Sequence, residues 1–447
     1  MRETPGNAEA IGWLIRVGLR QMTSLLSLIA GLILYGWPLL IEAFAVRRQI
    51  LRRGKDRGIQ RVPTNLLRLI EGGDLESIYR KYQNLDQYFL HLIPGVTGLV
   101  VGSNWGTTNR FELRLREDYV LVETPYRRWW SGWSAIQFLL RHLRLIRKYR
   151  LTLIHANSPY VSGLWGVILS RLTGLPVCVS IHADYPKSES LQGNVIPRIL
   201  GSLWISSAVE RFVYRSADRV LPIRSHMISH LEQAGCCREK IRIFPHGVPL
   251  TEPPDGPSVD VFEQFDIPAG SRLICSASRM EQENYCDDLV DISRRLVRHH
   301  PDVICVLCGG GSRLESLRQR VADEGNAERI LLPGNVAHET VLQLRRAAEV
   351  NLCLMGGFSL IEAAQAGRPV IAYNVEWHHE LVENGRTGFL VSERDIDKVI
   401  ARVAELLADP HAAAHMGDAA RRRAIEHCSL ERANATKRAI YRELAHA

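Results

Sequence analysis

The residues best suited to ligand chemistry lie at positions 356 to 362. Gly356 and Gly357 precede Phe358 and Ser359, and Glu362 follows within one helical turn. Glycine has no Cβ atom, so its backbone can approach a ligand closely and can adopt positive φ. The free amides of a first helical turn, together with the helix dipole, favour an anion. A carboxylate beside them can accept hydrogen bonds from sugar hydroxyls, so the stretch suits a diphosphate and its ribose.

The same residues have a second interpretation that needs no ligand. Ser359 is a good N-cap residue, and Glu362 stands three positions after it, which is the spacing of a capping box. These residues by themselves favour neither interpretation over the other.

Three more candidate residues come directly after predicted strands. His182 and Asp184 follow a strand over 177–181, and Arg279 follows a strand over 273–277. Ligands of α/β proteins bind at the carboxyl ends of strands, so we expect these side chains to face a cleft. A guanidinium there can neutralise the charge of a leaving diphosphate. The alternative for His182 is a loop histidine that caps a strand end.

Several short motifs occur in a characteristic order along the chain. Besides residues 356–391, they are Ile181-His182-Ala183-Asp184, Pro245-His246-Gly247-Val248, Ser278-Arg279-Met280, Gly309-Gly310-Gly311 and Cys428-Ser429-Leu430-Glu431-Arg432. In this order and spacing the chain resembles glycosyltransferase family 4 over roughly residues 150–445. The resemblance implies a retaining enzyme with the GT-B fold, in which two Rossmann-like domains with parallel sheets face each other across a cleft. It also implies a nucleotide-sugar donor and no metal or other cofactor.

The resemblance assigns roles to the candidate residues. A family histidine that contacts the transferred sugar matches His182, and Asp184 could orient this histidine or meet the acceptor. Arg279 matches the arginine that holds the diphosphate, and residues 356–362 match the donor-binding signature. Retention is expected to proceed by front-face attack, with the leaving phosphate taking the acceptor proton.

Two positions depart from the family pattern. The family pairs its arginine with a lysine five positions on, where this chain has Asn284. The first acid of the family's Glu-x7-Glu spacing falls on Leu354. These departures put the sugar identity and the activity in question. A catalytically inactive GT-B scaffold that assists a membrane enzyme is therefore a second hypothesis, and a GT-B epimerase or phosphorylase is a third.

The composition and the positions of the cysteines indicate the cellular compartment and exclude several kinds of binding site. The chain has 447 residues and a net charge of +8, and all nine cysteines follow residue 177. This distribution favours free thiols in a reducing compartment. Cys305 and Cys308 lie three apart on a predicted strand and should point to opposite faces, which predicts core packing instead of a metal pair. The sequence shows no phosphate loop and no nucleic-acid recognition module.

A membrane segment is predicted near the N-terminus. Residues 21–41 carry no charge and are mostly apolar, and as a helix they would span ~30 Å of hydrocarbon. A basic collar follows, which by the positive-inside rule places the C-terminal part in the cytoplasm of a bacterial cell. Gly36-Trp37-Pro38 could break the segment into a re-entrant hairpin instead. A cleaved signal peptide fits less well, because the apolar region is long and arginines follow it.

A second membrane signal lies at residues 127–150. This stretch contains seven basic residues, no acid and three interleaved tryptophans, and 136–150 has the pattern of an amphipathic helix. Such a helix suits an anionic lipid surface. The alternative is a helix that covers a sheet, with its arginines solvated.

The alternation of strands and helices predicts two parallel-sheet halves. The predicted parts are an anchor and basic collar over 1–62, an acceptor domain over 63–250, a linker over 251–257, a donor domain over 258–430, and a last helix over 431–447 that returns to the acceptor domain. Within the first half we expect a helix over 75–83, a loop over 102–108 and one long helix over 197–216.

These observations predict a membrane-anchored retaining glycosyltransferase. It would pass a sugar from a nucleotide-diphosphate donor to a membrane-associated acceptor, for example a lipid-linked saccharide, in envelope or exopolysaccharide synthesis. The predicted partners are the donor, the acceptor and the lipid surface, with no nucleic acid. The sequence leaves the base, the sugar and the oligomeric state open.

Overall fold

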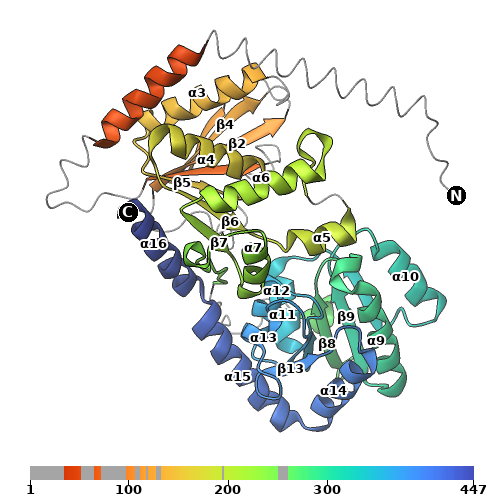
Figure 1. Ribbon diagram of the computed structural model, residues 1–447. Coiled ribbons are helices and arrows are strands. Elements are labelled where there is room, and N and C mark those ends of the chain that lie inside the picture. The colour runs from red at the N-terminus through yellow and green to blue at the C-terminus, as the bar shows by residue number, and fades with distance from the viewer. Residues whose placement is uncertain are drawn as a thin grey trace, which may run out of the picture. The chain divides into compact units, whose positions relative to one another are not determined.

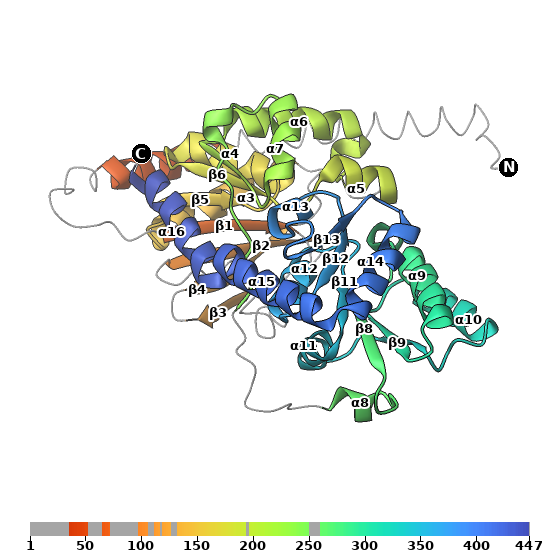
Figure 2. The ribbon, with the colours of Figure 1, turned by 90° about the horizontal axis from the view of Figure 1, so that it is seen from below.

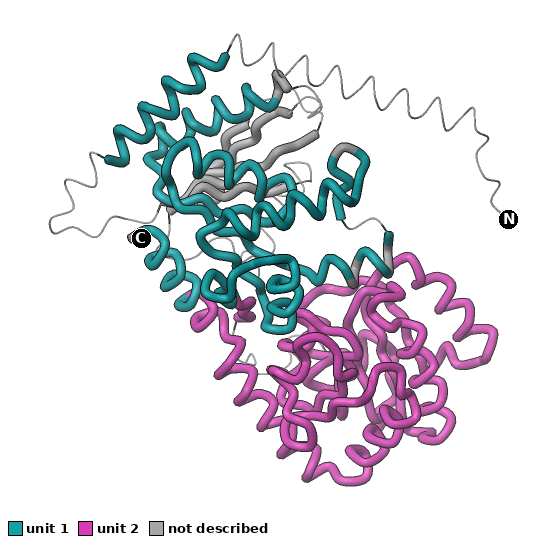
Figure 3. Tube along the Cα trace, in the orientation of Figure 1, with its two compact units in different colours: residues 1–244, 435–447 teal, residues 245–434 magenta. Residues whose placement is uncertain are grey.

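The protein is seen in a computed structural model that divides into two compact units (Figures 1 and 3). Unit 1 comprises Met1–Phe244 and Ala435–Ala447, and unit 2 comprises Pro245–Asn434. The structure describes residues 35–51, 65–71, 97–105, 111–116, 119–126, 132–193, 196–249 and 260–446. The predicted linker over 251–257 and the predicted helix over 75–83 lie outside these residues.

Unit 1 contains a seven-stranded sheet in the order β3-β4-β2-β1-β5-β6-β7. The pairs are parallel, as the alternation predicted, except that the edge strand β3 runs antiparallel to β4. The strands are β1 (Asn65–Glu71), β2 (Thr97–Trp105), β3 (Phe111–Arg116), β4 (Tyr119–Tyr126), β5 (Leu153–Ala156), β6 (Val177–Ile181) and β7 (Arg219–Pro222).

Two predictions of local structure in unit 1 were wrong. Residues 102–105 were expected in a loop, yet they belong to β2, which pairs with β1 on one side and β4 on the other. Two ladders of backbone hydrogen bonds outweigh the weak strand propensity of this glycine- and asparagine-containing segment. The long helix expected over 197–216 begins only at Leu203, because Gly201 adopts φ +78° and Ser202 then caps the helix by accepting from the Ile205 amide.

Three helices pack on one face of this sheet (Figure 1). They are α3 (Gly132–Lys148), α4 (Val161–Thr173) and α6 (Leu203–Ser216). The amphipathic helix predicted over 136–150 is present as α3, but its predicted contact with a lipid surface is not what its apolar side makes. Leu139, Leu143 and Ile146 are buried in the shared core, so this side of the helix covers the sheet. Residues 35–51 form a further helix that packs against the outside of α3 through this same core.

The predicted membrane segment falls only partly within the described chain. Residues 21–34 lie outside it, and residues 35–41 begin the helix that continues to residue 51. Within the described ranges, no helix combines the length and the apolar character needed to cross a bilayer.

The opposite face of β5 is covered by the C-terminal part of α16 (Leu430–His446). His155 alternates with Ile154, which faces α3 and α4, so its ring points to the other side of the sheet. There its Nδ1 lies 2.5 Å from the hydroxyl of Tyr441, and its ring meets Phe244 edge-on. Arg219 of β7 adds an ion pair to Glu443. His155 is thus a core residue of unit 1.

Unit 1 contains another buried histidine, His142, whose environment opposes protonation. His142 of α3 is fully buried, its Nδ1 lies 2.8 Å from the Phe138 carbonyl oxygen, and its Nε2 contacts no polar partner among the described residues. Desolvation by burial lowers the pKa of His142 from 6.5 to about 4. Below pH 6.5 the unfolded chain therefore binds a proton that the folded chain excludes.

We expect the free energy of unfolding of unit 1 to fall by about 2 kcal/mol between pH 7 and pH 5, because of this one group. Urea denaturation at the two pH values measures the difference, and His142→Phe should remove most of it. An unchanged pH slope in the variant would show that His142 titrates normally in the folded state.

Unit 2 contains a six-stranded parallel sheet in the order β10-β9-β8-β11-β12-β13 (Figure 2). Its strands are β8 (Arg272–Ala277), β9 (Val303–Cys308), β10 (Ile330–Gly334), β11 (Val350–Leu352), β12 (Val370–Tyr373) and β13 (Gly388–Val391). Its helices are α8 (Val261–Gln264), α9 (Cys286–His299), α10 (Leu314–Asp323), α11 (His338–Ala347), α12 (Phe358–Gln365), α13 (His378–Leu381), α14 (Ile396–Ala408) and α15 (Pro410–Cys428).

Helices cover both faces of this sheet. The core on one face includes residues of α9, α10, α14 and α15, and the core on the other includes residues of α8 and α11. Along β9 the buried residues alternate between the two cores, which places Cys305 in the first and Cys308 in the second. The prediction that these cysteines point to opposite faces is confirmed. All nine cysteines are free thiols.

Candidate active site

The candidate residues of unit 2 follow the two strands at which the sheet order changes direction. From β8 the chain proceeds outward to β9 and β10, and then returns to β11 on the other side of β8 (Figure 2). Loops that leave such neighbouring strands diverge, and α/β proteins bind ligands at this point. Arg279 and Asn284 follow β8, and residues 356–362 follow β11.

The loop that carries Arg279 is fixed by backbone pairing with the triple glycine after β9. The Ser278 amide donates to the Cys308 carbonyl at 3.0 Å, and the Met280 amide donates to the Gly310 carbonyl at 2.9 Å. A Cβ atom on Gly309 would lie 1.8 Å from the Ser278 carbonyl oxygen, so a side chain there would force the two segments apart. The glycines therefore set the position from which the Arg279 side chain projects.

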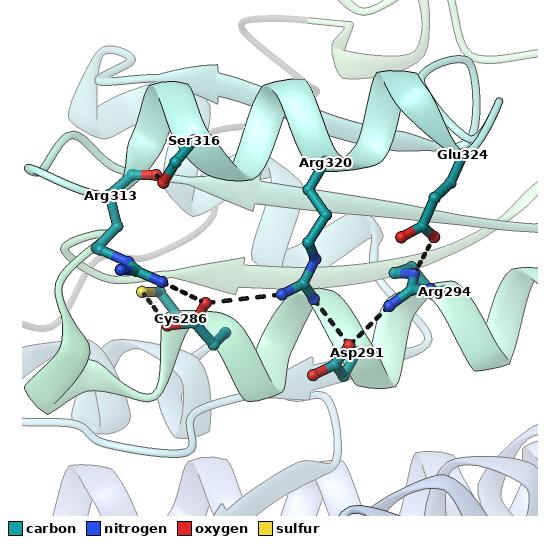
Figure 4. A network of polar contacts seen from close by, with 8 residues as sticks. Cys286, Asp291, Arg294, Arg313, Ser316, Arg320 and Glu324 are labelled. Atoms are coloured by element: carbon teal, nitrogen blue, oxygen red, sulfur yellow. Dashed lines mark hydrogen bonds and ion pairs between the residues drawn. The ribbon is translucent and has the colours of Figure 1, made fainter.

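A network of ion pairs joins α9 to α10, whose start lies beside the Arg279 loop (Figure 4). Asp287 of α9 accepts from Arg313 at 2.8 Å, and Arg320 of α10 binds Asp291 of α9 at 2.7 Å. The amide of Arg313 also donates to the Met280 carbonyl at 3.1 Å. Since these side chains are partly exposed, each pair contributes little by itself, and the network as a whole keeps the start of α10 against the Arg279 loop.

The Arg279 guanidinium is itself exposed and weakly held. Its side chain is 70% exposed, and one nitrogen lies 3.4 Å from the carboxylate of Glu283. An exposed pair of this kind is worth about 0–1 kcal/mol, so an anion can compete for the arginine. Asn284 stands in a 3-10 turn nearby, and its buried Oδ1 accepts no hydrogen bond within the described chain. Asn284 supplies no positive charge to this region.

The start of α12 differs from the predicted capping box. The N-cap residue is Gly357, which has no side chain to cap the helix, and the helix begins at Phe358. Ser359 instead turns toward the sheet, where its hydroxyl donates to the Ala277 carbonyl at the end of β8 and accepts from Arg345 at 2.9 Å. The Ser359 hydroxyl thus links α12 to the end of β8. It does not cap the helix, because it also binds the buried Arg345.

Glu362 is almost buried one turn further along α12. Its side chain is 11% exposed, with Oε2 3.6 Å from Arg345 and Oε1 3.1 Å from Nε2 of His338. Arg345, which is 1% exposed, thus contacts both Ser359 and Glu362. The two partners of Glu362, Arg345 and His338, are both side chains of α11. These contacts hold the carboxylate in place for a further hydrogen-bond donor.

The two glycines before α12 do not adopt the positive φ that the sequence analysis allowed for them. Neither Gly356 nor Gly357 is among the glycines with positive φ. The Gly356 amide donates to Nε2 of His378 at 3.1 Å, and Nδ1 of this buried ring lies 2.7 Å from the Tyr373 carbonyl oxygen. A Cβ atom on Gly356 would lie 2.7 Å from the Leu360 Cβ, whereas a Cβ atom on Gly357 would meet nothing within 4 Å. Gly356 is required by packing, and Gly357 borders open space.

Phe358 at the start of α12 contacts His246. The rings of Phe358 and His246 stack with their centroids 4.9 Å apart and their planes 6° apart. Both residues belong to unit 2. The signal for His246 was the Pro245-His246-Gly247 motif itself. No sequence signal pointed to Arg345, because an arginine in the last turn of a helix is usually solvated.

The candidates of unit 1 follow the carboxyl end of β6. His182 is partly exposed, and its Nε2 lies 2.8 Å from the hydroxyl of Ser180. Asp184 precedes α5 (Tyr185–Gln192), and its charge contributes to a raised pKa of His230 in α7 (Ile228–Gln233). The larger cause of that rise is Glu210, whose carboxylate lies 3.6 Å from the ring. The sequence did not indicate His230 or Glu210, which come from separate helices.

Two family models match successive parts of the chain. The glycosyl transferase 4-like domain matches residues 99–247, and glycosyl transferases group 1 matches residues 260–423. The chain belongs to glycosyltransferase family 4.

Relatives and solved structures agree with this assignment. The glycosyltransferase is 27% identical over 344 residues to the alpha-maltose-1-phosphate synthase of Mycolicibacterium smegmatis, covering 70% of this chain and 84% of the relative. It is 31% identical over 175 residues to the GDP-mannose-dependent alpha-(1-6)-phosphatidylinositol monomannoside mannosyltransferase of the same organism, covering 37% of this chain and 46% of the relative.

The fold is that of solved GT-B enzymes. Anabaena HepE in complex with UDP superposes with a TM-score of 0.65 at 17% identity, covering 84% of this chain and 99% of that chain. The sucrose-phosphate synthase of Thermosynechococcus elongatus gives a TM-score of 0.66 at 19% identity, covering 85% of this chain and 99% of that chain. The predicted α/β GT-B fold with parallel sheets is confirmed.

The neighbouring glycines of the glycosyltransferase provide a matched pair of variants. Gly356→Ala is expected to lower the free energy of unfolding by about 1–3 kcal/mol, because its methyl group overlaps Leu360. Gly357→Ala should leave stability nearly unchanged and weaken nucleotide binding if a ligand approaches the backbone there. Thermal unfolding and calorimetric titration with nucleoside diphosphates measure both effects. Equal nucleotide affinity in Gly357→Ala and wild type would place the ligand elsewhere.

Proposed function

We propose that the glycosyltransferase moves a sugar, with retention of configuration, from a nucleotide-diphosphate sugar to a membrane-associated acceptor in envelope or exopolysaccharide synthesis. The observation that carries this proposal is the meeting of the Arg279 loop with the start of α12 at the carboxyl end of β8. Ser359 bonds the carbonyl of the last β8 residue, and Arg279 follows that residue by two positions. A cationic loop and the N-terminus of a helix are thereby brought to the same end of β8.

Each part of this region suits one portion of the donor. Arg279 would bind the diphosphate, assisted by the dipole at the start of α12. Glu362 would accept hydrogen bonds from the ribose hydroxyls, since Arg345 and His338 already fix its position. One relative is GDP-mannose-dependent, and one similar structure contains UDP, so the base is left to experiment.

The transfer step requires little covalent chemistry from the protein. The bond between the anomeric carbon and the leaving phosphate oxygen breaks, and the acceptor oxygen attacks on the same face. The leaving phosphate then takes the acceptor proton. His182 would contact the transferred sugar, with Asp184 beside it to orient the ring or to meet the acceptor. Arg279 would neutralise the charge that grows on the diphosphate, which makes a metal ion unnecessary.

The proposed location is the cytoplasmic side of a bacterial plasma membrane. The uncharged segment over 21–41 and the arginines after it support this proposal. The buried free thiols fit a reducing compartment. A lipid-linked saccharide is the acceptor class that such a location favours.

A second candidate function is favoured by one observation. Leu354, at the position of the family's first acid, is 1% exposed and belongs to the apolar core of unit 2. The carboxylate that family members place near the sugar is therefore replaced by a packing residue. A GT-B scaffold that binds a membrane enzyme without turnover would need no such carboxylate.

A panel of sugar nucleotides distinguishes the two candidates. Purified full-length protein in native membranes is incubated with each donor, and release of nucleoside diphosphate is measured with and without a metal chelator. The proposed enzyme should release diphosphate from one donor, with or without the chelator, and Arg279→Ala should abolish this release. A protein that turns over none of the donors, with or without added membrane acceptors, would favour the scaffold.

A further inference from the structure

The helix over residues 35–51 is apolar on two opposite faces. One face packs into unit 1, where Leu39, Ala43 and Val46 are buried. The other face is exposed, and its large apolar side chains include Trp37 at 76% and Phe44 at 68% exposure. We call this face the apolar stripe, and its members are Trp37, Leu40, Ile41, Phe44 and Leu51.

The stripe follows helical periodicity. Its members recur at intervals of three, four and seven positions, so they lie along one side of the helix. The three buried residues recur on the opposite side by the same rule. Five of the eight exposed large hydrophobic residues found in the described chain belong to this stripe, which makes it a concentrated patch.

The helix cannot turn its stripe inward, because polar contacts also fix its orientation. Glu42 binds Arg147 of α3 at 2.9 Å and Arg144 at 3.5 Å. Arg47 donates to the carbonyls of Arg171 and Leu172 at the end of α4. Together with the buried residues, these contacts hold the helix along α3, so the stripe faces away from unit 1.

Exposed arginines lie on the helix of the stripe and on the adjoining helix α3. Arg48 is exposed and, by the helical period, lies on the same side as Phe44 and Leu51. On the adjoining helix, Arg144 and Arg147 remain 58% and 48% exposed although they pair with Glu42. Helix α3 contains no aspartate or glutamate. A patch of tryptophan, phenylalanine and leucine edged by arginines matches an anionic lipid surface in both polarity and charge.

We propose that the apolar stripe docks on an anionic lipid bilayer, with the helix over 35–51 lying in the plane of the interface. The inference rests on the membrane association in the proposed function. It identifies the surface of the protein that contacts the lipid. The uncharged sequence of residues 21–34, which leads directly into this helix, supports a lipid occupant over a protein one. In this arrangement the bilayer contacts unit 1 beside α3, and no spanning helix is required for attachment.

Vesicle binding by full-length protein tests the proposal. The variant Trp37→Gln/Phe44→Gln removes two stripe residues, and Trp204→Gln/Phe212→Gln removes an equivalent pair from exposed positions on α6. Sedimentation uses vesicles of phosphatidylcholine with and without phosphatidylglycerol. The stripe variant should bind the anionic vesicles at least about tenfold more weakly than wild type, and the α6 variant should bind within about twofold.

Two results would overturn the docking proposal. Unchanged vesicle binding in the stripe variant would mean that other residues attach the protein to the lipid. A change of oligomeric state in the stripe variant, measured by light scattering in detergent, would mean that a second copy of the chain covers the stripe. Quenching by brominated lipids provides an independent check, since Trp37→Phe should keep vesicle binding while reducing the quenched fluorescence.

The same samples separate this proposal from the enzymatic one. Diphosphate release in detergent should be equal in wild type and the stripe variant, because the stripe lies outside the donor residues. Absent turnover in both, combined with stripe-dependent vesicle binding, would reject the proposed reaction and leave the docking surface standing.

Discussion

Glu362→Gln is expected to lower kcat/KM for the sugar nucleotide by about 100-fold. The carboxylate would accept two charge-assisted hydrogen bonds from the ribose, and each such bond is worth ~1.5–3 kcal/mol. Glutamine keeps the shape and one acceptor oxygen but removes the charge. Steady-state kinetics measures the loss, and titration with the nucleoside diphosphate should show a similar fall in affinity, since ribose contacts are made before the chemical step.

A matched control separates this effect from a general loss of surface charge. Glu315→Gln alters a carboxylate on α10 that is 81% exposed and pairs with Arg318 of the same helix. Its kinetics should equal those of wild type. If Glu362→Gln kept kcat/KM within about threefold of wild type, Glu362 would serve only as the partner of Arg345.

Arg345→Met is expected to have the largest effect on stability, lowering the free energy of unfolding of unit 2 by about 3–5 kcal/mol. Arg345 is 1% exposed and is among the largest fully buried side chains of the described chain. Its removal would leave the Glu362 carboxylate buried beside methionine and would untie Ser359 from α11. Urea denaturation followed by circular dichroism measures the loss.

The neighbouring arginine provides the control for this prediction. Arg346→Met changes a partly exposed side chain at the next position of α11 and should cost less than about 1 kcal/mol. Equal losses in the two variants would show that the helix end, and not the buried guanidinium, determines stability.

The double variant Arg345→Met/Glu362→Gln completes a thermodynamic cycle. Removing both members of a buried charged pair costs less than removing one, because neither charge is left uncompensated. The double variant should therefore be more stable than the sum of the single losses implies. Additive losses would mean that the two side chains do not interact in the folded state.

The sequence indicated which residues form the candidate site, but not which contacts hold their side chains in place. Arg279 was placed after the correct strand, and residues 356–362 were placed at the start of a helix, since an apolar run marks the strand and the glycine pair precedes the helix. The capping box was wrong because the spacing of Ser359 and Glu362 is a local signal. Arg345 comes from another helix and engages both side chains, so the local pattern could not show that they face inward.

The same difference between local and long-range interactions explains which parts of the fold were predicted correctly. Buried strands and amphipathic helices were predicted correctly where the pattern was strong, as in β6, β8 and α3. Residues 102–105 were missed because their strand conformation depends on pairing with β1 and β4, which are separate in the sequence.

The order of motifs along the chain by itself determined the family and the GT-B fold, because each motif records a local requirement of a strand end, a tight approach or a helix start. Only the tertiary structure decided that Leu354 is a core residue, that Arg345 supports Glu362, and that the helix over 35–51 presents an apolar stripe to the outside. Burial is a property of packed neighbours. It depends on which distant segments cover a residue, and hydrophobic pattern alone does not name them.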